Sequence, residues 1–174
     1  MIQQIKKILF TSDLSEQSIE VFEQTVGLAF QTGASITLLH VLDNATSKNQ
    51  ERVSYMIDNE TYERIRREGQ EFAKNALIGK QKSLPVIQKA MQEHYGKKSE
   101  ELSGPESMVA IDAIQVMYGN PAEKIVEVAE TMDFDLIAMG YHKRGSILRA
   151  LAGRAEKGVM RRSRKPLFLV PLDD

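Results

Sequence analysis

One strongly patterned stretch, residues 136–170, restricts this chain to a small number of folds. Two short apolar runs, residues 136–139 and 167–170, enclose Gly140, a basic segment and a helix-forming segment that begins near Gly153. A strand, a glycine-bearing loop, a helix and a second strand in this order are typical of parallel α/β sheets. Ligands of such sheets bind at the carboxyl edge of the strands, where helix N-termini favour anions. The stretch therefore predicts a fold class and the place of a site.

The rest of the chain repeats the alternation of strands and helices. Residues 5–10, 36–42 and 110–118 have strand character, and helical spacing follows the first and third of these runs. Ser15 is the predicted N-cap of the first helix, and Gly33 is its predicted stop. The pattern predicts one doubly wound α/β domain, residues 1–174, with helices on both faces of a five-stranded parallel sheet of order 3-2-1-4-5.

Residues 119–123 contain the clearest helix start in the chain. Gly119 ends a strand, Asn120 is the predicted N-cap, and Pro121 occupies the first helical position, where its missing N–H costs nothing. Glu123 falls three residues after Asn120, which is the spacing of a capping box.

Residues 44–107 do not continue this alternation, because the segment is polar, charged and poor in strand formers. It predicts a helical insertion between strands two and three, within the domain. One helix is expected over residues 62–77, and a second from Ser83 to Gly96, followed by a loop over residues 97–107. The insertion has three possible roles, as a lid, as a dimer extension or as a partner surface.

The composition indicates a globular protein and excludes several kinds of chemistry. Apolar residues make up 42% and charged residues 27% of the 174 residues, and no apolar run is long enough for a membrane span. With no cysteine, disulfides, thiol catalysis and thiolate metal sites are excluded. These features lead us to expect a cytoplasmic protein.

Positive charge is concentrated between Tyr141 and Lys165. This segment has nine Lys or Arg residues and one acid, a net charge of +8, whereas the whole chain has a net charge of −1. The segment is either a solvated helix face, an anion site or a docking patch for acidic partners. Nucleic-acid binding is not expected, because only Tyr141 and Phe168 could stack on bases in this part of the chain.

Five segments together resemble the universal stress protein family. They are residues 11–13 (TSD), 39–41 (LHV), 119–122 (GNPA), 135–140 (DLIAMG) and 165–171 (KPLFLVP), and the resemblance covers about two-thirds of the chain. It implies a Rossmann-like, homodimeric stress-response module that pairs through its last strand. The family includes members that bind ATP and members that do not. ATP and AMP are thus the candidate ligands here, and the actual cofactor is left open.

The nucleotide-binding members carry the motif G-x2-G-x9-G-[ST] after strand four. Gly140 and Gly153 match its first and third glycines, but Lys143 replaces the second glycine and Arg154 the Ser/Thr. The two cations either block the site or adapt it to an anion, and the loss of half the motif favours a closed or weakened pocket. The cofactor-binding set implied by the resemblance is Thr11, Ser12, Asp13, Val41, Met139, Gly140, His142, Lys143, Gly153 and Arg154.

Two of these residues also have ordinary structural interpretations. Asp13 matches the family's acidic residue beside the nucleoside, but it can equally serve as a helix-capping carboxylate. Val41 matches the position whose backbone meets adenine, but it can equally be strand core.

The sequence shows no convincing catalytic or metal-binding pattern. His40, His94 and His142 lack paired spacing, and neither a P-loop nor a G-x-S-x-G elbow is present. We therefore expect a non-enzymatic binding or regulatory module that acts through protein partners. The alternative is a nucleotide hydrolase or transferase, such as a weak ATPase, on the same fold.

Overall fold

The structure is a computed structural model, and it describes residues 4–42, 58, 60, 61, 64, 84–104, 109–142 and 153–172. The helix predicted over residues 62–77 therefore lies outside the described residues, apart from single positions. Within the described ranges, no helix is long and apolar enough to cross a membrane.

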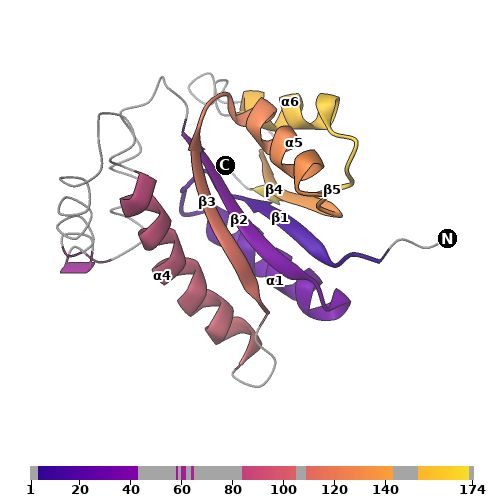
Figure 1. Ribbon diagram of the computed structural model, residues 1–174. Coiled ribbons are helices and arrows are strands. Elements are labelled where there is room, and N and C mark those ends of the chain that lie inside the picture. Colours follow the sequence, from indigo (N-terminus) through magenta and orange to yellow (C-terminus); the bar gives the residue numbers. More distant parts are fainter. Residues whose placement is uncertain are drawn as a thin grey trace.

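A five-stranded parallel sheet forms the centre of the molecule (Figure 1). Its strand order, β3-β2-β1-β4-β5, confirms the predicted order 3-2-1-4-5. The three inner strands are largely buried and apolar, as parallel strands covered by helices must be, and the two edge strands are partly exposed. The strands are β1 (Lys7–Thr11), β2 (Ser35–Leu42), β3 (Ile111–Tyr118), β4 (Leu136–His142) and β5 (Leu167–Leu172).

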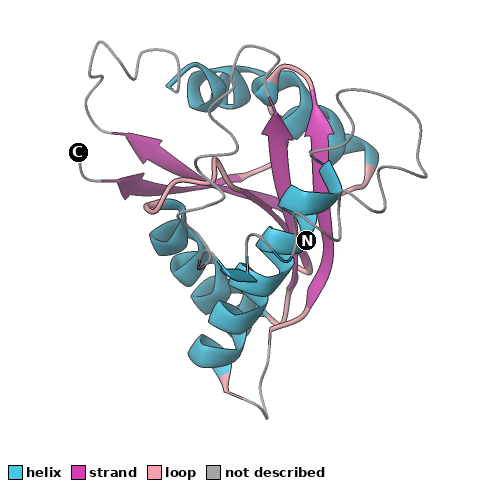
Figure 2. Ribbon diagram, turned by 90° about the vertical axis from the view of Figure 1, so that its left-hand side faces the viewer, coloured by secondary structure: helices cyan, strands magenta, loops and turns pink. Residues whose placement is uncertain are grey.

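Helices cover both faces of the sheet (Figure 2). Helices α1 (Ser18–Thr32) and α4 (Leu84–Ser103) pack on one face, and α5 (Pro121–Thr131) and α6 (Gly153–Arg162) pack on the other. Helix α4 is the described part of the predicted insertion. It lies beside α1 and β3, so the insertion contributes directly to the core.

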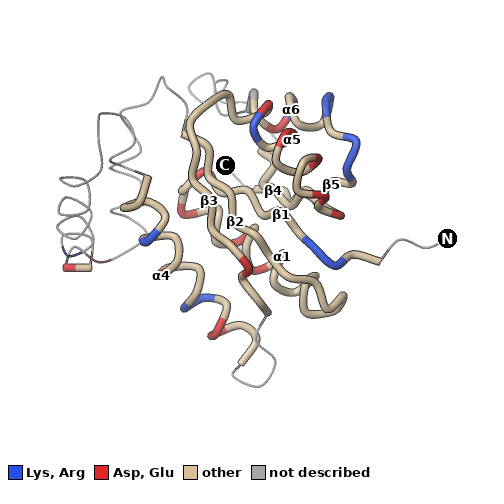
Figure 3. The backbone as a smooth tube through the Cα atoms, viewed as in Figure 1, with Lys and Arg blue, Asp and Glu red and all other residues tan. Residues whose placement is uncertain are grey.

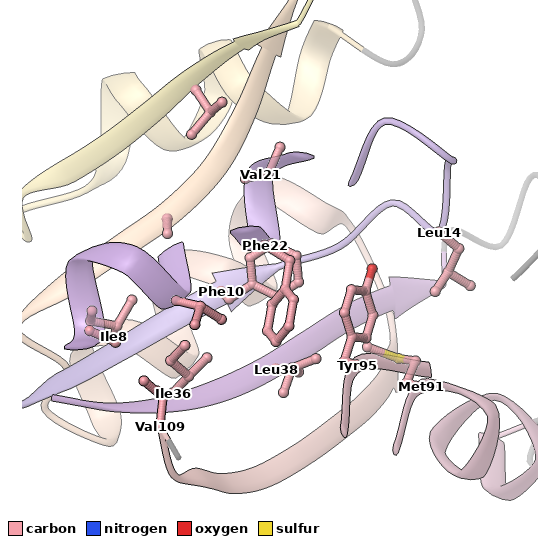
Figure 4. Close-up of a cluster of buried hydrophobic side chains, with 14 of the residues drawn as sticks. Ile8, Phe10, Leu14, Val21, Phe22, Ile36, Leu38, Met91, Tyr95 and Val109 are labelled. Atoms are coloured by element: carbon pink, nitrogen blue, oxygen red, sulfur yellow. The ribbon is translucent and has the colours of Figure 1, made fainter. Parts of the chain in front are cut away.

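Three aromatic rings form the centre of the larger core (Figure 4). The ring of Phe22 lies 5.3 Å from that of Phe10 and 4.7 Å from that of Tyr95, and the rings of Phe10 and Tyr95 are 5.4 Å apart. These rings come from α1, β1 and α4, and all three are fully buried. Burial of side chains of this size stabilises the fold by about 1.5–3 kcal/mol each. Because the three rings come from different elements, the cluster joins the insertion helix to the sheet.

The carboxylate of Asp135 holds the beginning of β1 beside β4. Its Oδ2 atom accepts hydrogen bonds from the backbone N–H groups of Lys6 and Lys7, at 2.9 and 3.0 Å. This acid begins the family-like segment 135–140, and the two bonds give it a structural role that needs no ligand.

Helix α5 begins as predicted. Its N-cap is Asn120, whose side chain accepts a hydrogen bond from the N–H of Glu123 at 3.2 Å, and Pro121 opens the helix. The carboxylate of Glu123 lies 4.0 Å from Arg162 of α6, so the side chain expected to complete a capping box contacts the neighbouring helix.

Two helix boundaries differ from prediction. Helix α1 begins at Ser18 with Gln17 as N-cap, because Ser15 belongs to a preceding turn in which its carbonyl accepts from the N–H of Ser18. Gly33 ends α1 in a left-handed conformation, as predicted. Helix α4 passes through Gly96 and ends at Ser103, so a loop over residues 97–103 was a wrong prediction. Burial of Tyr95 and Ser99 holds α4 together across Gly96.

Helices α5 and α6 approach closely at Gly158. A Cβ atom on Gly158 would lie 2.5 Å from the Cβ of Ala122, closer than two carbon atoms can approach. The glycine therefore serves close packing on this face of the sheet, at the cost of the weak helix propensity of glycine.

We expect Gly158→Ala to destabilise the protein by about 1–3 kcal/mol, because overpacking outweighs the gain in helix propensity. The double variant with Ala122→Gly should recover much of this loss, because it restores the space between the helices. Chemical denaturation of the three variants tests this, with Ala122→Gly alone as the control. Equal stability of Gly158→Ala and the wild type would contradict the packing argument.

Candidate functional site

The short central strand defines the candidate site. At its carboxyl end β1 pairs as far as Thr11 with Leu39 of β2, and as far as Phe10 with Ala138 of β4. Strand β2 continues to Leu42 and β4 to His142. Strands β2 and β4 flank β1 on opposite sides, so the order of the strands reverses at β1. The carboxyl end of β1 is therefore the switch point of the sheet, where ligands of open α/β sheets bind.

Backbone groups of Val41 point toward this switch point. The carbonyl of Leu39 accepts from the N–H of Ser12, and the carbonyl of Leu42 accepts from the N–H of Gly119 beyond β3. Backbone groups alternate in direction along a strand, so those of Val41 point to the same side as those of Leu39. Strand β1 has ended at this level. The N–H and C=O of Val41 therefore face the space beyond the end of β1.

Asp13 lies at the switch point in a tight turn after β1. Its Oδ1 atom accepts hydrogen bonds from the N–H of Ser15 at 2.9 Å and from the Ser15 hydroxyl at 2.6 Å, and the residue is exposed. This Asx turn shows that Asp13 orders the chain before α1, although it does not cap the helix itself. The helix-capping interpretation of Asp13 is therefore wrong, because Gln17 is the N-cap of α1 and no side chain caps that helix.

Thr11 and Ser12, the two predicted site residues that precede Asp13, form hydrogen bonds inside the protein. The hydroxyl of Ser12 is buried and lies 2.7 Å from the Tyr95 hydroxyl. The Thr11 hydroxyl donates to the carbonyl of Ala138 at 3.4 Å. The structure thus places Thr11 and Ser12 beneath the site, where they support the turn that carries Asp13.

Met139 and Gly140 belong to β4, and both have packing roles. The side chain of Met139 is buried in the core between the sheet and α5 and α6. A Cβ atom on Gly140 would lie 2.7 Å from a Leu172 methyl group and 3.2 Å from one of Val21. The first glycine of the motif is therefore required by the contact of β5 and α1 with β4, whether or not a nucleotide binds.

The remaining predicted residues lie at the end of β4 or after it. His142 ends the strand and is partly buried, and its Nδ1 atom is shielded from solvent without a hydrogen-bond partner among the described residues. Gly153 and Arg154 open α6, so the backbone of the second half of the motif lies at a helix N-terminus. Lys143 lies outside the described residues, as do the side chain of Arg154 and the rest of residues 143–152.

Glu156 is a site residue that the sequence analysis did not identify. It lies in the first turn of α6 and is 9% exposed. Burial raises the pKa of its carboxyl group, and the raising effect is opposed by a hydrogen bond with the backbone of His142 and by the His142 ring. The negative charge of Asp13 raises the pKa further, so the two carboxylates interact electrostatically. The sequence signal was present, because Glu156 is the sole acid in the +8 segment.

Most of the described positive charge lies away from this site. Helix α6 runs back along the sheet from the site, so its last turn, with Arg161 and Arg162, is at the opposite edge (Figure 3). There Lys165 pairs with Asp133 at 2.6 Å, just before β4 begins. Cations at this end complement the helix dipole. Among the described residues, the basic segment is thus mainly a helix end, and it does not line the switch point.

Comparison with known proteins agrees with this arrangement. The model of the universal stress protein family matches residues 4–171. The chain belongs to the universal stress protein family. Universal stress protein MJ0577 of Methanocaldococcus jannaschii is 26% identical over 165 residues, covering 95% of this chain and 94% of that protein.

Solved structures of similar fold extend over the whole chain. The structure of MJ0577 aligns with a TM-score of 0.59 at 20% identity and covers 99% of both chains. The universal stress protein UspA from Lactobacillus plantarum aligns with a TM-score of 0.57 at 18% identity, over 97% of this chain and 99% of that one. A universal stress protein in complex with cAMP aligns with a TM-score of 0.55 at 13% identity, over 97% and 98%. These likenesses confirm the fold.

We expect Glu156→Gln to make stability less dependent on pH. A raised pKa in the folded state means that the contribution of Glu156 to stability is greatest below the unfolded pKa of Glu, about 4.3, and falls as pH rises through the folded pKa. The glutamine side chain cannot ionise and can still accept a hydrogen bond from the backbone of His142. The variant should therefore gain stability over the wild type as pH rises toward neutrality.

Urea denaturation across this pH range measures the difference. The exposed Glu130→Gln is the control for loss of one negative charge elsewhere. A stability difference between Glu156→Gln and the wild type that does not grow with pH would disprove the assignment.

Proposed function

We propose that this universal stress protein is a non-enzymatic, homodimeric binding and regulatory module. Its ligand site is the switch point, where it binds an adenine nucleotide whose phosphates are held only weakly. The backbone of Val41, directed into the space beyond the end of β1, is the observation that carries this proposal. It offers one donor and one acceptor at a fixed spacing, which suits the edge of a purine.

Asp13 supports the nucleoside end of the same site. It is exposed beside the end of β1, and its Asx turn fixes the carboxylate. A carboxylate in this position can accept hydrogen bonds from ribose hydroxyls, a role that acidic residues have in other nucleotide-binding α/β folds.

Glu156 supports weak binding at the phosphate end. Its carboxylate, close to Asp13, adds negative charge at the helix terminus that would otherwise attract phosphates. A ligand with few phosphate charges is therefore favoured, AMP or a cyclic nucleotide over ATP. The structure of a family member in complex with cAMP is consistent with a ligand of this size.

The first test is to identify any nucleotide that the protein carries. Protein purified without added nucleotide is denatured, and the supernatant is analysed by mass spectrometry beside a thermal-shift screen of ATP, ADP, AMP and cAMP. A ligand at about 100 times its dissociation constant should stabilise the protein by about 2.7 kcal/mol. We expect AMP or cAMP to stabilise it most, and this effect to be smaller in Asp13→Ala.

The variants separate the two ends of the site. Glu156→Gln should strengthen binding of ATP more than binding of AMP, because the removed charge repels each phosphate. Arg154→Ala should weaken both if Arg154 contacts phosphate. If no nucleotide stabilises the wild type or Glu156→Gln, the nucleotide proposal is wrong and the site is closed. Steady phosphate release from ATP that disappears in Asp13→Ala would instead support the enzymatic alternative.

The two edges of the sheet support dimerisation through β5. Helix α4 covers the β3 edge, where Gln88 donates a hydrogen bond to the carbonyl of Ile114 at 2.7 Å. At the other edge, the carbonyl of Pro166 faces β4. Backbone groups alternate in direction along the strand, so those of Leu167, Leu169 and Pro171 point outward, and Pro171 has no N–H to donate. The β5 edge therefore offers a short row of backbone groups for pairing with a second copy.

Sedimentation equilibrium at several protein concentrations tests this part of the proposal. We expect the mass of a dimer at micromolar concentration, because pairing of two β5 strands would satisfy the outward backbone groups and bury their half-exposed apolar side chains. A monomer mass at every concentration would contradict it.

A further inference from the structure

A chain of buried hydroxyl groups links the insertion helix to the turn that carries Asp13. The Tyr95 hydroxyl on α4 lies 2.7 Å from the Ser12 hydroxyl and 2.8 Å from the Ser18 hydroxyl. Tyr95 is fully buried, and Ser12 and Ser18 are 6% and 3% exposed. Burial raises the pKa of Tyr95 to about 12, so its hydroxyl keeps its proton at any physiological pH.

The Ser18 hydroxyl fixes one end of this chain of hydrogen bonds. It donates to the carbonyl of Ser15 at 2.6 Å, so it accepts from Tyr95 at 2.8 Å or from Ser12 at 3.4 Å. Each hydroxyl has a single proton, so either Ser12 donates to Tyr95 and Tyr95 to Ser18, or Tyr95 donates to Ser12 and Ser12 to Ser18. Ser12 accepts from the N–H of Leu14 at 3.0 Å, which completes the chain. Hydrogen bonds aligned in this way strengthen one another.

The two ends of the chain lie on the two residues that directly follow Asp13. One end is the N–H of Leu14 and the other is the carbonyl of Ser15, and Asp13 itself binds the N–H of Ser15. Leu14 has a φ of 61°, a left-handed conformation that costs a residue with a side chain about 1–3 kcal/mol. Its side chain is 1% exposed, and Figure 4 shows it in the same buried cluster as Tyr95.

We infer that Tyr95 is a positioning residue, which holds the strained turn from Ser12 to Ser15 and thereby fixes Asp13 at the switch point. The inference means that α4, the described part of the insertion, controls the geometry of the site from beneath. Lys98, one turn further along α4, pairs with Glu23 of α1 at 2.8 Å and holds the two helices together. The consequence for ligand affinity rests on the proposed function, whereas the effect on the turn does not.

Tyr95→Phe is the variant that tests the inference, because it keeps the buried ring and removes only the hydroxyl. Ser99→Ala is the matched control, since Ser99 lies on the same helix and its buried hydroxyl donates to Val109, away from the turn. In ligand-free protein, hydrogen exchange of the Leu14 and Ser15 amides should be roughly tenfold faster in Tyr95→Phe than in the wild type or the control. Equal exchange in all three proteins would overturn the inference.

Nucleotide affinity gives the second measurement. By calorimetry, Tyr95→Phe should bind AMP roughly five- to tenfold more weakly than the wild type, the effect of one neutral hydrogen bond, and Ser99→Ala should bind as the wild type does. In an Asp13→Ala background Tyr95→Phe should cause no further loss, because its effect passes through Asp13. The same fold loss in both backgrounds would show a merely structural role and overturn the inference.

Two further outcomes are distinguishable. If the wild type binds no nucleotide, the proposed function fails, and amide exchange alone decides whether Tyr95 positions the turn. If Tyr95→Phe does not fold, Ser18→Ala breaks the next hydrogen bond of the chain and leaves the tyrosine in place, with the same exchange expected.

Discussion

The early end of β1 is the constraint on which the rest of the site depends. Strand β1 is central, and it stops at Thr11 while its neighbours β2 and β4 continue to Leu42 and His142. Because of this difference in length, the backbone of Val41 faces the region beyond the end of β1, and the Asp13 turn follows directly at that end. Any ligand of this protein that follows the general rule for open α/β sheets would meet these groups first.

The turn after β1 is stabilised from beneath by the insertion. Leu14 is held in an unfavourable backbone conformation by a hydrogen bond to Ser12, whose hydroxyl is in turn held by Tyr95. The aromatic cluster of Phe10, Phe22 and Tyr95 provides the apolar energy that keeps α4 in place. The polar helix α4 therefore contributes to the site through the buried ring and the buried hydroxyl of Tyr95.

Electrostatics at the site differ from what the basic segment indicates. Arg161, Arg162 and Lys165 lie at the far end of α6, whereas the buried Glu156, whose pKa is raised by the charge of Asp13, lies in its first turn. Gly140, which matches the nucleotide motif, is also needed for contact with Leu172 and Val21. A partial match to the motif can therefore persist for reasons of packing, so the motif alone is a weak measure of nucleotide affinity.

The sequence by itself determined the order of the strands, the two faces of helices, the start of α5 at Asn120 and the family. These features follow from local patterns, because alternation, capping residues and apolar runs act over a few neighbouring residues. Where the tertiary structure decided the outcome, distant residues meet. Ser15 lost its expected capping role to a turn, and α4 continued through Gly96 because Tyr95 and Ser99 are buried. Glu156, from the other end of the chain, came within electrostatic reach of Asp13. No local pattern contains these contacts, since each depends on which helix packs against which strand end.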